Sequence, residues 1–530
     1  MSMRLFLSNS VETELVETQL PNDNVYELEL EDLLPDFGSA DFKSTLDLKP
    51  KSFAQLQLRA RNAVRALLRD NESRILLLCG SSFIDNLGTA QRLVFDVASI
   101  EVPIIYQSKK IELFGKDGHS GILGAGGIFI LNASVILNHP QWLSKLDELL
   151  SYGNLRLILC ADAVDASALQ VLWPAVENAL HADLVLEFAA QGGCYLMGAL
   201  VADFCQRYKL KPFDVKAIEL LCTYSCRQSG DRRWIGLPEL KLRGLCREAS
   251  GYAKNSAVGV KDVLKAIAAD DFRANYLAES QLRDHRDRQI LIATSGEVVG
   301  QINGLSVIET SGTSYEYGEP VRITATLRAG GEGDVIDIER KAELAGQIHA
   351  KAMMIINGYL TREFGYEQPL PLSASLVFEQ SYSEIDGDSA SLTGLCAVIS
   401  AFANIPIRQD LAVTGAVDQF GDVQPVGGVN EKIEGFFRIC RLHGLTGTQG
   451  VVIPRSCVSQ LVLRPSVLNA VKKGLFHIYA VDHVKGAVKI LTSVPWGQND
   501  DENTVYGSIC ARLDELSLNR DHRPWWHFWN

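Results

Sequence analysis

The chain has 530 residues, enough for roughly three or four domains at the usual domain size. Hydrophobic residues make up 47% and charged residues 22%, which is ordinary for a folded globular protein. The formal net charge of −13 argues against a dominant role on nucleic acid or anionic membrane, where a basic face is expected, although a local basic patch remains open.

The N-terminal residues 1–8 contain one Arg and no sustained apolar run, so we expect no signal peptide. The longest stretch without charged side chains, residues 118–144, is broken by glycines and Pro140, which favours a buried strand with loops over a membrane span. Eleven cysteines in a leaderless chain indicate a reducing compartment, and we expect a cytoplasmic location. Cys222 and Cys226 lie four residues apart, as neighbours on one helix face do. We therefore expect two buried small side chains there and no metal site.

The first segment expected is an acidic leader followed by a helix, over residues 1–72. Residues 11–36 carry nine Asp or Glu and no Lys or Arg. This stretch is interpreted either as a flexible acidic arm or as an edge piece laid on a neighbour. Apolar residues then recur at helical spacing over residues 53–68.

An α/β domain with a parallel sheet is expected over residues 73–191. Continuous apolar runs, which are typical of strands buried on both faces, occur at residues 74–79, 127–131, 155–160 and 184–188, and residues 91–98 have a helical pattern. Residues 192–275 are helical by pattern, so a small helical domain is expected over residues 192–280.

From about residue 289 the pattern changes to an α+β domain, expected over residues 285–495. Its β-rich pieces are predicted at 289–294, 297–306, 321–329 and 373–379. Its helices are predicted at 341–363, 389–402 and 431–443. Residues 496–530 form a tail that ends in several aromatic side chains. The expected fold class is therefore multidomain, α/β with a helical domain followed by α+β.

Two stretches of the α+β domain carry residues suited to catalysis, FEQSYSEIDGDSA (378–390) and VTGAVDQFGDVQPVGGVNEKIEGFF (413–437). In the first, an acidic turn presents Ser389 where an apolar helix is predicted to start. Backbone N–H groups at a helix start have no internal partner, so they could form an oxyanion hole beside the serine. In the second, Asn430 is a plausible N-cap and Lys432 lies in the first helical turn.

The position of Lys432 bears on mechanism, because a general base must be neutral and a free lysine has a pKa of ~10.4. Burial and the positive end of a helix both disfavour the ammonium form. A lysine in a first turn is thus poorly placed for stability and well placed to take a proton from a serine. Taken singly, Ser389 is more simply an N-cap and Lys432 a solvated side chain, so the hypothesis depends on the joint pattern.

Residues 289–490 closely resemble the proteolytic domain of the Lon family, particularly its archaeal-type and bacterial LonB-like members. The resemblance includes GEVVGQINGL (296–305), DIERKAELAGQIHAKA (337–352) and LSASLVFEQSYSEIDGDSAS (372–391), together with the 413–437 block. It implies a Ser–Lys dyad of Ser389 and Lys432, with the hydroxyl of Thr414 against the lysine amine. It also implies that Asp386, in a turn that can rearrange, is a gating candidate, and that the chain forms a homo-oligomer, a ring of six subunits.

The upstream half resembles a Lon-type AAA+ module whose ATP motifs are eroded. The loop GSSFIDNLGTAQ (80–91) lacks the Lys and Ser/Thr of a phosphate-binding loop, and Asn132 replaces the metal-holding Asp of the second motif. Arg247 resembles the nucleotide-sensing arginine of the lid, although a solvated or ion-paired arginine explains it equally well. We therefore expect no required cofactor, although relatives of this kind use ATP and Mg²⁺.

Three functions remain open from the sequence. The favoured one is a serine endopeptidase that acts on peptides or unfolded proteins without ATP hydrolysis, with no nucleic-acid or membrane partner. The second is an ATP-dependent Lon-type protease with a non-standard nucleotide site. The third is a non-catalytic ring scaffold, as in some DNA-repair ATPases, but such scaffolds typically lose the Ser–Lys pair that is present here.

Overall fold

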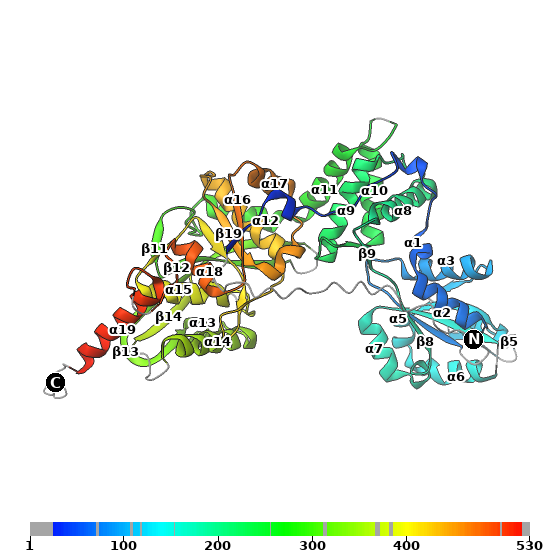
Figure 1. Ribbon diagram of the computed structural model, residues 1–530. Helices are drawn as coiled ribbons and strands as arrows, with labels where there is room; N and C mark the ends of the chain where they lie inside the picture. Colours follow the sequence, from blue (N-terminus) through cyan, green and yellow to red (C-terminus); the bar gives the residue numbers. More distant parts are fainter. Residues whose placement is uncertain are drawn as a thin grey trace, which may run out of the picture. The chain divides into compact units, whose positions relative to one another are not determined.

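The computed structural model describes residues 25–69, 74–106, 110–116, 119–152, 154–254, 256–310, 315–365, 372–380, 385–498 and 501–521. The chain divides into two compact units, which we name by their main sheets (Figure 1). The five-stranded unit contains residues 33–277 and 459–462. The seven-stranded unit contains residues 1–32, 278–458 and 463–530.

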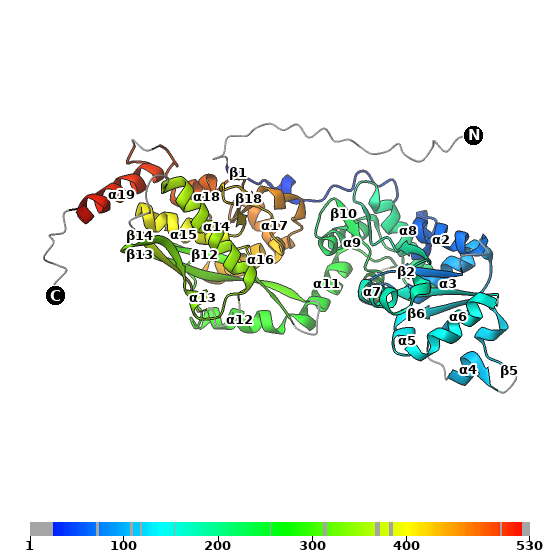
Figure 2. The same cartoon turned by 90° about the horizontal axis from the view of Figure 1, so that it is seen from below.

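The five-stranded unit has a parallel sheet with helices on both faces (Figure 2). The strands follow the order β3-β6-β7-β2-β8, and their bounds are β2 (Ile75–Cys79), β3 (Ile104–Ile105), β6 (Gly127–Asn132), β7 (Leu155–Ala161) and β8 (Leu180–Asp183). Alternate residues of β2 enter two separate cores: Leu76 and Leu78 lie in one, and Ile75 and Leu77 lie in the other. This double burial explains why the strand is apolar throughout.

The helices of this unit fall into two groups. Those near the sheet are α1 (Phe53–Leu56), α2 (Leu58–Arg69), α3 (Asn86–Ala98), α4 (Lys110–Phe114), α5 (Ala133–Leu137), α6 (Leu143–Tyr152) and α7 (Ala163–Leu172). A helical group follows with α8 (Gly193–Tyr208), α9 (Val215–Ser229), α10 (Glu239–Tyr252) and α11 (Val260–Ala274). Cys222 and Cys226 are fully buried on α9, as expected.

The predicted fourth strand at 184–188 is wrong. The sheet strand β8 ends at Asp183, and a separate strand β9 (Glu187–Ala189) pairs with β10 (Trp234–Gly236). Between them, the amide group of Val185 donates to the Gln57 side chain at 2.5 Å, and the Gln57 amide donates to the Val185 carbonyl at 3.1 Å. The backbone of Val185 is thus bonded to a glutamine side chain and not to a neighbouring strand, and within the predicted run Leu184 is buried whereas Leu186 is 47% exposed.

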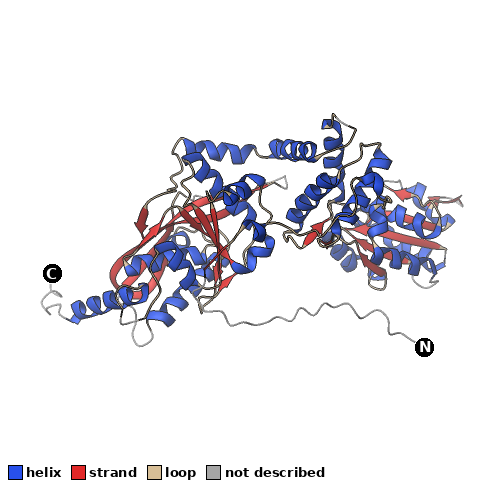
Figure 3. Cartoon of the chain, turned by 45° about the horizontal axis from the view of Figure 1, so that its top comes forward, coloured by secondary structure: helices blue, strands red, loops and turns tan. Residues whose placement is uncertain are grey.

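The seven-stranded unit has a mixed sheet in the order β1-β20-β19-β16-β12-β13-β14 (Figure 3). Its strands are β1 (Val25–Glu27), β12 (Gln301–Glu309), β13 (Glu316–Asp337), β14 (Leu372–Phe378), β16 (Leu411–Val413), β19 (Gly450–Pro454) and β20 (His477–Val481). The short strands are β11 (Glu297–Val299), β15 (Pro406–Arg408), β17 (Ala416–Val417) and β18 (Val423–Gln424). Residues 289–294, predicted as β-rich, form no strand.

The helices of this unit are α12 (Tyr276–Arg286), which begins at the boundary, α13 (Ile338–Lys341), α14 (Gln347–Phe364), α15 (Ser391–Ala403), α16 (Val429–His443), α17 (Pro465–Lys472), α18 (Val484–Thr492) and α19 (Val505–Asp521). The predicted helix 341–363 therefore begins too early: residues 342–346 are not helical, and α14 begins at Gln347. Every residue of α15 is buried, so this helix is the centre of the unit's core.

Part of the acidic leader lies within the described residues. Residues 25–27 form the edge strand β1, which pairs with β20, so the edge-piece interpretation holds for these residues. Residues 1–24 and the aromatic end of the tail, 522–530, lie outside the described residues. Among the helices that are described, none is both long and apolar enough to cross a membrane.

Candidate active site

Ser389 lies in a tight turn that leads into α15. The amide and hydroxyl groups of Ser391 both donate to the Asp388 carbonyl, at 2.9 and 2.7 Å, and close this turn. Ser389 was predicted at the first position of the helix, but the helix begins at Ser391. Since the amide of Leu392 donates to the Gly415 carbonyl at 3.1 Å, the first two helical N–H groups are already used.

This geometry changes which amides are available for an oxyanion. The N–H groups of Ser389 and Ala390 donate to no acceptor among the described residues. They lie at and directly after the candidate nucleophile, whereas the first two amides of the observed helix, those of Ser391 and Leu392, are satisfied by carbonyls.

Lys432 enters the same site from the first turn of α16. The N-cap of α16 is Gly428, not Asn430, which is buried inside the first turn. Gly428 has a φ of +64°, and an added Cβ would lie 2.5 Å from a methyl group of Val307, so both conformation and space favour glycine. The amide of Lys432 donates to the Gly428 carbonyl at 3.0 Å, which places the lysine one turn into the helix.

Thr414, directly after β16, connects the lysine to the serine. The Lys432 amine donates to the Thr414 hydroxyl at 3.1 Å, and that hydroxyl donates to the Ser389 carbonyl at 3.3 Å. The Gly415 amide also donates to the Ser389 carbonyl, at 2.9 Å. The structure therefore brings together the three residues that the sequence had placed in one site, although no hydrogen bond joins the Ser389 hydroxyl to Lys432 in the described part of the chain.

The environment of Lys432 favours a neutral amine. The side chain is 3% exposed, and within the described ranges no carboxylate forms an ion pair with it. Burial lowers the pKa of Lys432 from 10.5 to about 8, against smaller opposing effects of Cys457 and Asp388. With a pKa near 8, about a tenth of the amine is neutral at pH 7. A lysine in this state can accept a proton.

Cys457 is a neighbour of this site that sequence reasoning missed. It is fully buried, its sulfur accepts from the Val426 amide at 3.4 Å, and its thiol donates to the Val426 carbonyl at 3.6 Å. These contacts hold the loop that leads to Gly428 and α16. A single cysteine far from Lys432 in the chain carries no motif, so no sequence signal marked it.

Asp386 lies in the acidic turn before Ser389, but its hydrogen bonds are to α14. Its carboxylate accepts from the amides of Ile348 and His349 at 3.0 and 3.4 Å, so it caps the N-terminus of that helix. The amide of Gly346 donates to the Ile385 carbonyl at 2.9 Å and fastens the same turn. The turn before Ser389 is therefore held to the N-terminus of α14 by an exposed carboxylate. Such a contact is compatible with a turn that can detach from the helix.

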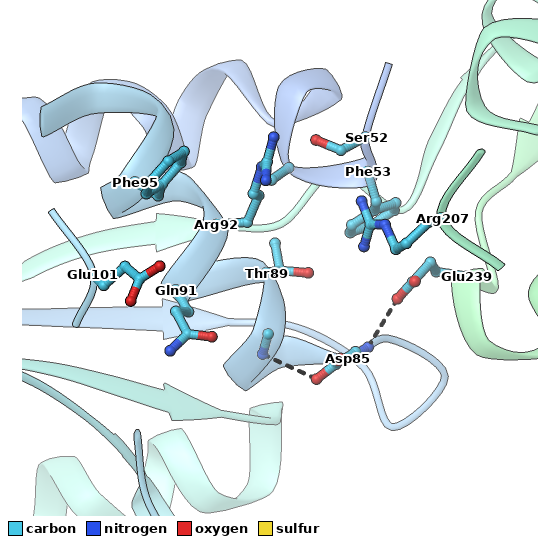
Figure 4. A pocket seen from close by; sticks show the side chains of 12 residues that line it. Ser52, Phe53, Asp85, Thr89, Gln91, Arg92, Phe95, Glu101, Arg207 and Glu239 are labelled. Atoms are coloured by element: carbon cyan, nitrogen blue, oxygen red, sulfur yellow. Dashed lines mark hydrogen bonds between the residues drawn. The ribbon is translucent and has the colours of Figure 1, made fainter. Parts of the chain in front are cut away.

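In the five-stranded unit, the loop after β2 contains a carboxylate where a phosphate-binding loop binds anions. Asp85 is the N-cap of α3 and accepts from the Gly88 amide at 3.0 Å, while its own amide donates to the buried Glu239 at 3.2 Å (Figure 4). The amide of Leu240 also donates to the Phe83 carbonyl at 3.0 Å. The loop after β2 is therefore held by the carboxylates of Asp85 and Glu239 and by the backbone at the start of α10.

Several other residues in the regions that resemble nucleotide motifs bond to protein groups. Asn86 occupies the first position of α3 and turns its side-chain amide to the Ser81 carbonyl at 3.1 Å. Asn132 caps α5, and its oxygen accepts from the amide and hydroxyl of Ser134 at 3.0 and 2.8 Å. Arg247 is exposed on α10, whereas Arg243, one turn earlier, lies 3.5 Å from Glu239.

A cavity of about 580 Å³ lies beside this loop, between α1, α3 and α10 (Figure 4). Its two arginines are each paired with a carboxylate of their own helix: Arg92 with Asp96 at 3.1 Å, and Arg207 with Asp203 at 2.7 Å. Both guanidinium groups are thus already paired with protein carboxylates. The carboxylates of Asp85 and Glu239 add negative charge to the wall of the cavity.

Known protein families match both units. Residues 381–492 match the Lon protease (S16) C-terminal proteolytic domain, and residues 212–273 match the archaeal LonB AAA+ ATPase lid domain. The chain is 44% identical over 308 residues to a putative Lon protease homolog of Escherichia coli K12, covering 58% of this chain and 52% of that protein. For a putative Lon protease homolog of Haemophilus influenzae the identity is 43% over 323 residues, covering 59% and 53%.

The archaeal Lon protease of Archaeoglobus fulgidus is 31% identical over 260 residues, covering 48% of this chain and 39% of that protein. The chain thus spans about half the length, or less, of these curated relatives.

Proposed function

We propose, for a chain that belongs to the Lon protease family, that the seven-stranded unit is a serine endopeptidase with Ser389 as nucleophile and Lys432 as general base. The observation that carries this proposal is the buried Lys432 amine, which bonds to the Thr414 hydroxyl and has no carboxylate partner among the described residues. Burying a lysine in this way costs stability, and a proton-accepting role explains why the chain contains it.

The proposed reaction uses Lys432 as the base and then as the acid. Neutral Lys432 takes the proton of the Ser389 hydroxyl as its oxygen attacks the carbonyl carbon of the substrate. The oxyanion that forms accepts hydrogen bonds from the amides of Ser389 and Ala390. The Lys432 ammonium then donates its proton to the leaving amine, which breaks the peptide bond and leaves an acyl ester on Ser389. Water hydrolyses the ester by the same route, and Thr414 holds the lysine amine throughout.

We also propose that this cleavage does not require ATP. Asp85 and Glu239 place negative charge at the start of α3, where a phosphate would have to bind, and Asn132 supplies no carboxylate for Mg²⁺. Without hydrolysis the five-stranded unit cannot drive unfolding, so the substrates are peptides or chains that are already unfolded.

The assembly and location are part of the same proposal. A homo-oligomeric ring, expected to contain six subunits, would restrict access to Ser389 and spare folded proteins. A cytoplasmic location agrees with the eleven cysteines, all of which are free thiols, eight of them buried.

The test is cleavage of casein and of a fluorogenic peptide, with and without Mg·ATP. Wild type should cleave both unfolded casein and the peptide at rates that ATP leaves unchanged, and Ser389→Ala should abolish both activities. Ser466→Ala is the matched control and should leave both activities unchanged, because Ser466 is exposed on α17 of the same unit and lies outside the proposed site. Cleavage that survives Ser389→Ala would remove the proposed nucleophile. Cleavage that depends on ATP would restore the ATP-dependent alternative.

A further inference from the structure

Three side chains with metal-binding chemistry meet at one end of the five-stranded sheet. Cys79 is the last residue of β2, and His181 and Asp183 lie two residues apart on the edge strand β8. The two strands are parallel neighbours, in a register that pairs Cys79 with Asp183 and Leu77 with His181. Because side chains alternate along a strand, Cys79, His181 and Asp183 share one face of the sheet at its carboxyl edge.

Their ligand atoms are close enough to bind one ion. The Cys79 sulfur, an imidazole nitrogen of His181 and a carboxylate oxygen of Asp183 all lie within 4.8 Å of one another, and the imidazole Nε2 lies 3.0 Å from the carboxylate Oδ1. Around a tetrahedral Zn²⁺, with the usual bond lengths, such atoms lie roughly 3.3–3.6 Å apart. Small side-chain rotations, with no change in the strands, would therefore complete the arrangement.

The surroundings also favour a cation. The His181 and Asp183 side chains are 48% and 62% exposed, so a metal ion can reach them and keep a water ligand. Asp162, which follows β7, caps α7 and places a further carboxylate near the Cys79 thiol. An ordinary surface His–Asp ion pair would explain two of the three groups and contribute little to stability, but it leaves the cysteine beside them unexplained.

We propose that Cys79, His181 and Asp183 bind Zn²⁺ or a similar borderline-soft divalent cation, with water as the fourth ligand. The mixed sulfur, nitrogen and oxygen set selects this class over Mg²⁺ or Ca²⁺, which prefer oxygen ligands. The ion would tie the end of β8 to the end of β2, directly before the loop that begins at Gly80. This proposal departs from the expectation of no metal drawn from the sequence, and the proposed site is independent of the peptidase.

The first test uses Co²⁺ as a spectroscopic substitute for Zn²⁺ in the full-length chain after treatment with chelator. One equivalent should produce a thiolate-to-cobalt charge-transfer band in the near ultraviolet, which Zn²⁺ displaces and Mg²⁺ does not. Cys79→Ser should abolish the band, and Asp183→Asn should lower the affinity by about 10- to 100-fold or more. Cys510→Ser, another partly exposed cysteine, should leave the band unchanged.

A second test needs no variant. Zn²⁺ should protect Cys79 from alkylation in the native protein, as mapped by mass spectrometry, while Cys510 should react equally with and without the ion. No band with a tenfold excess of Co²⁺, a band that persists in Cys79→Ser, or unprotected alkylation of Cys79 would each overturn the proposal.

Discussion

Replacing the proposed general base should stabilise the protein while it abolishes activity. The pKa of Lys432 falls from 10.5 to about 8 on folding, and each pKa unit corresponds to about 1.4 kcal/mol, so the charged lysine opposes folding by about 3 kcal/mol at pH 7. Lys432→Met keeps the length of the side chain and removes the charge. The lost hydrogen bond to Thr414 costs about 1 kcal/mol, which leaves a net gain of about 2 kcal/mol.

The stability advantage of Lys432→Met over wild type should decrease as the pH rises. Below pH 8 the lysine is protonated in both folded and unfolded chains, so the full penalty is present and the variant has its largest advantage. Between pH 8 and 10.5 the folded lysine has lost its proton while the unfolded one retains it, so wild-type stability rises relative to the variant. Near pH 10 the remaining penalty of about 1 kcal/mol should be offset by the lost hydrogen bond.

The assay is urea-dependent hydrogen exchange of α16 peptides at pH 7 and pH 10, because α16 reports on the seven-stranded unit directly. Lys473→Met, at an exposed position just beyond α17, is the control and should change stability by less than about 0.5 kcal/mol. A Lys432→Met variant that is less stable than wild type at pH 7, or equally favoured at pH 7 and pH 10, would refute the account of Lys432 as a destabilising buried base.

Three further predictions concern the same unit and the assembly. The value of kcat/KM for peptide cleavage should rise about tenfold from pH 7 to pH 9, as the neutral fraction of a lysine with a pKa of about 8 rises from about a tenth to about nine tenths; a flat profile would exclude Lys432 as the base. Thr414→Val should lower kcat by about 10- to 100-fold with little change in KM, because the amine loses its anchor and substrate contacts do not change; an unaltered kcat would separate Thr414 from the mechanism. Light scattering should give six times the 58.2 kDa mass of one chain, whereas a monomer at micromolar concentration would contradict the ring.

Asp386 offers a fifth, structural prediction. Asp386→Ala should speed hydrogen exchange at the first amides of α14, equivalent to about 1 kcal/mol, and Asp386→Asn, which keeps an accepting oxygen, should largely preserve the cap. Equal protection of the Ile348 amide in wild type and Asp386→Ala would show that the carboxylate does not hold the turn.

Much of the architecture could be predicted because it depends on local patterns. The strands at 74–79, 127–131 and 155–160 were recognisable from unbroken apolar runs, which a sheet covered on both faces requires. The run at 184–188 has the same appearance, yet the backbone of Val185 within it bonds to Gln57, more than 120 residues earlier in the chain. A contact over that separation leaves no trace in the composition of the run itself.

In the candidate site, too, local patterns could be predicted and distant backbone contacts could not. Ser389 and Lys432 were recognisable together, because their pattern and the family resemblance agree, and Thr414 followed from the resemblance alone. The start of α15 was predicted two residues too early, because the local turn from Asp388 to Ser391 and the distant Gly415 carbonyl, which accepts from Leu392, are backbone contacts that composition does not mark. Likewise, the pairing of Cys79 with His181 and Asp183 follows from a strand register that no sequence pattern states.

The edge strand β1 has a consequence for how this chain is synthesised. Val25 pairs with Val481, and Glu27 forms an ion pair with His477 at 2.5 Å, across 450 residues. At roughly 5–20 residues per second, β20 leaves the ribosome about 20–90 s after β1. The whole five-stranded unit emerges in the meantime, so β1 must wait unpaired while an intervening unit folds. The last strand to join the seven-stranded sheet is therefore the first to be made.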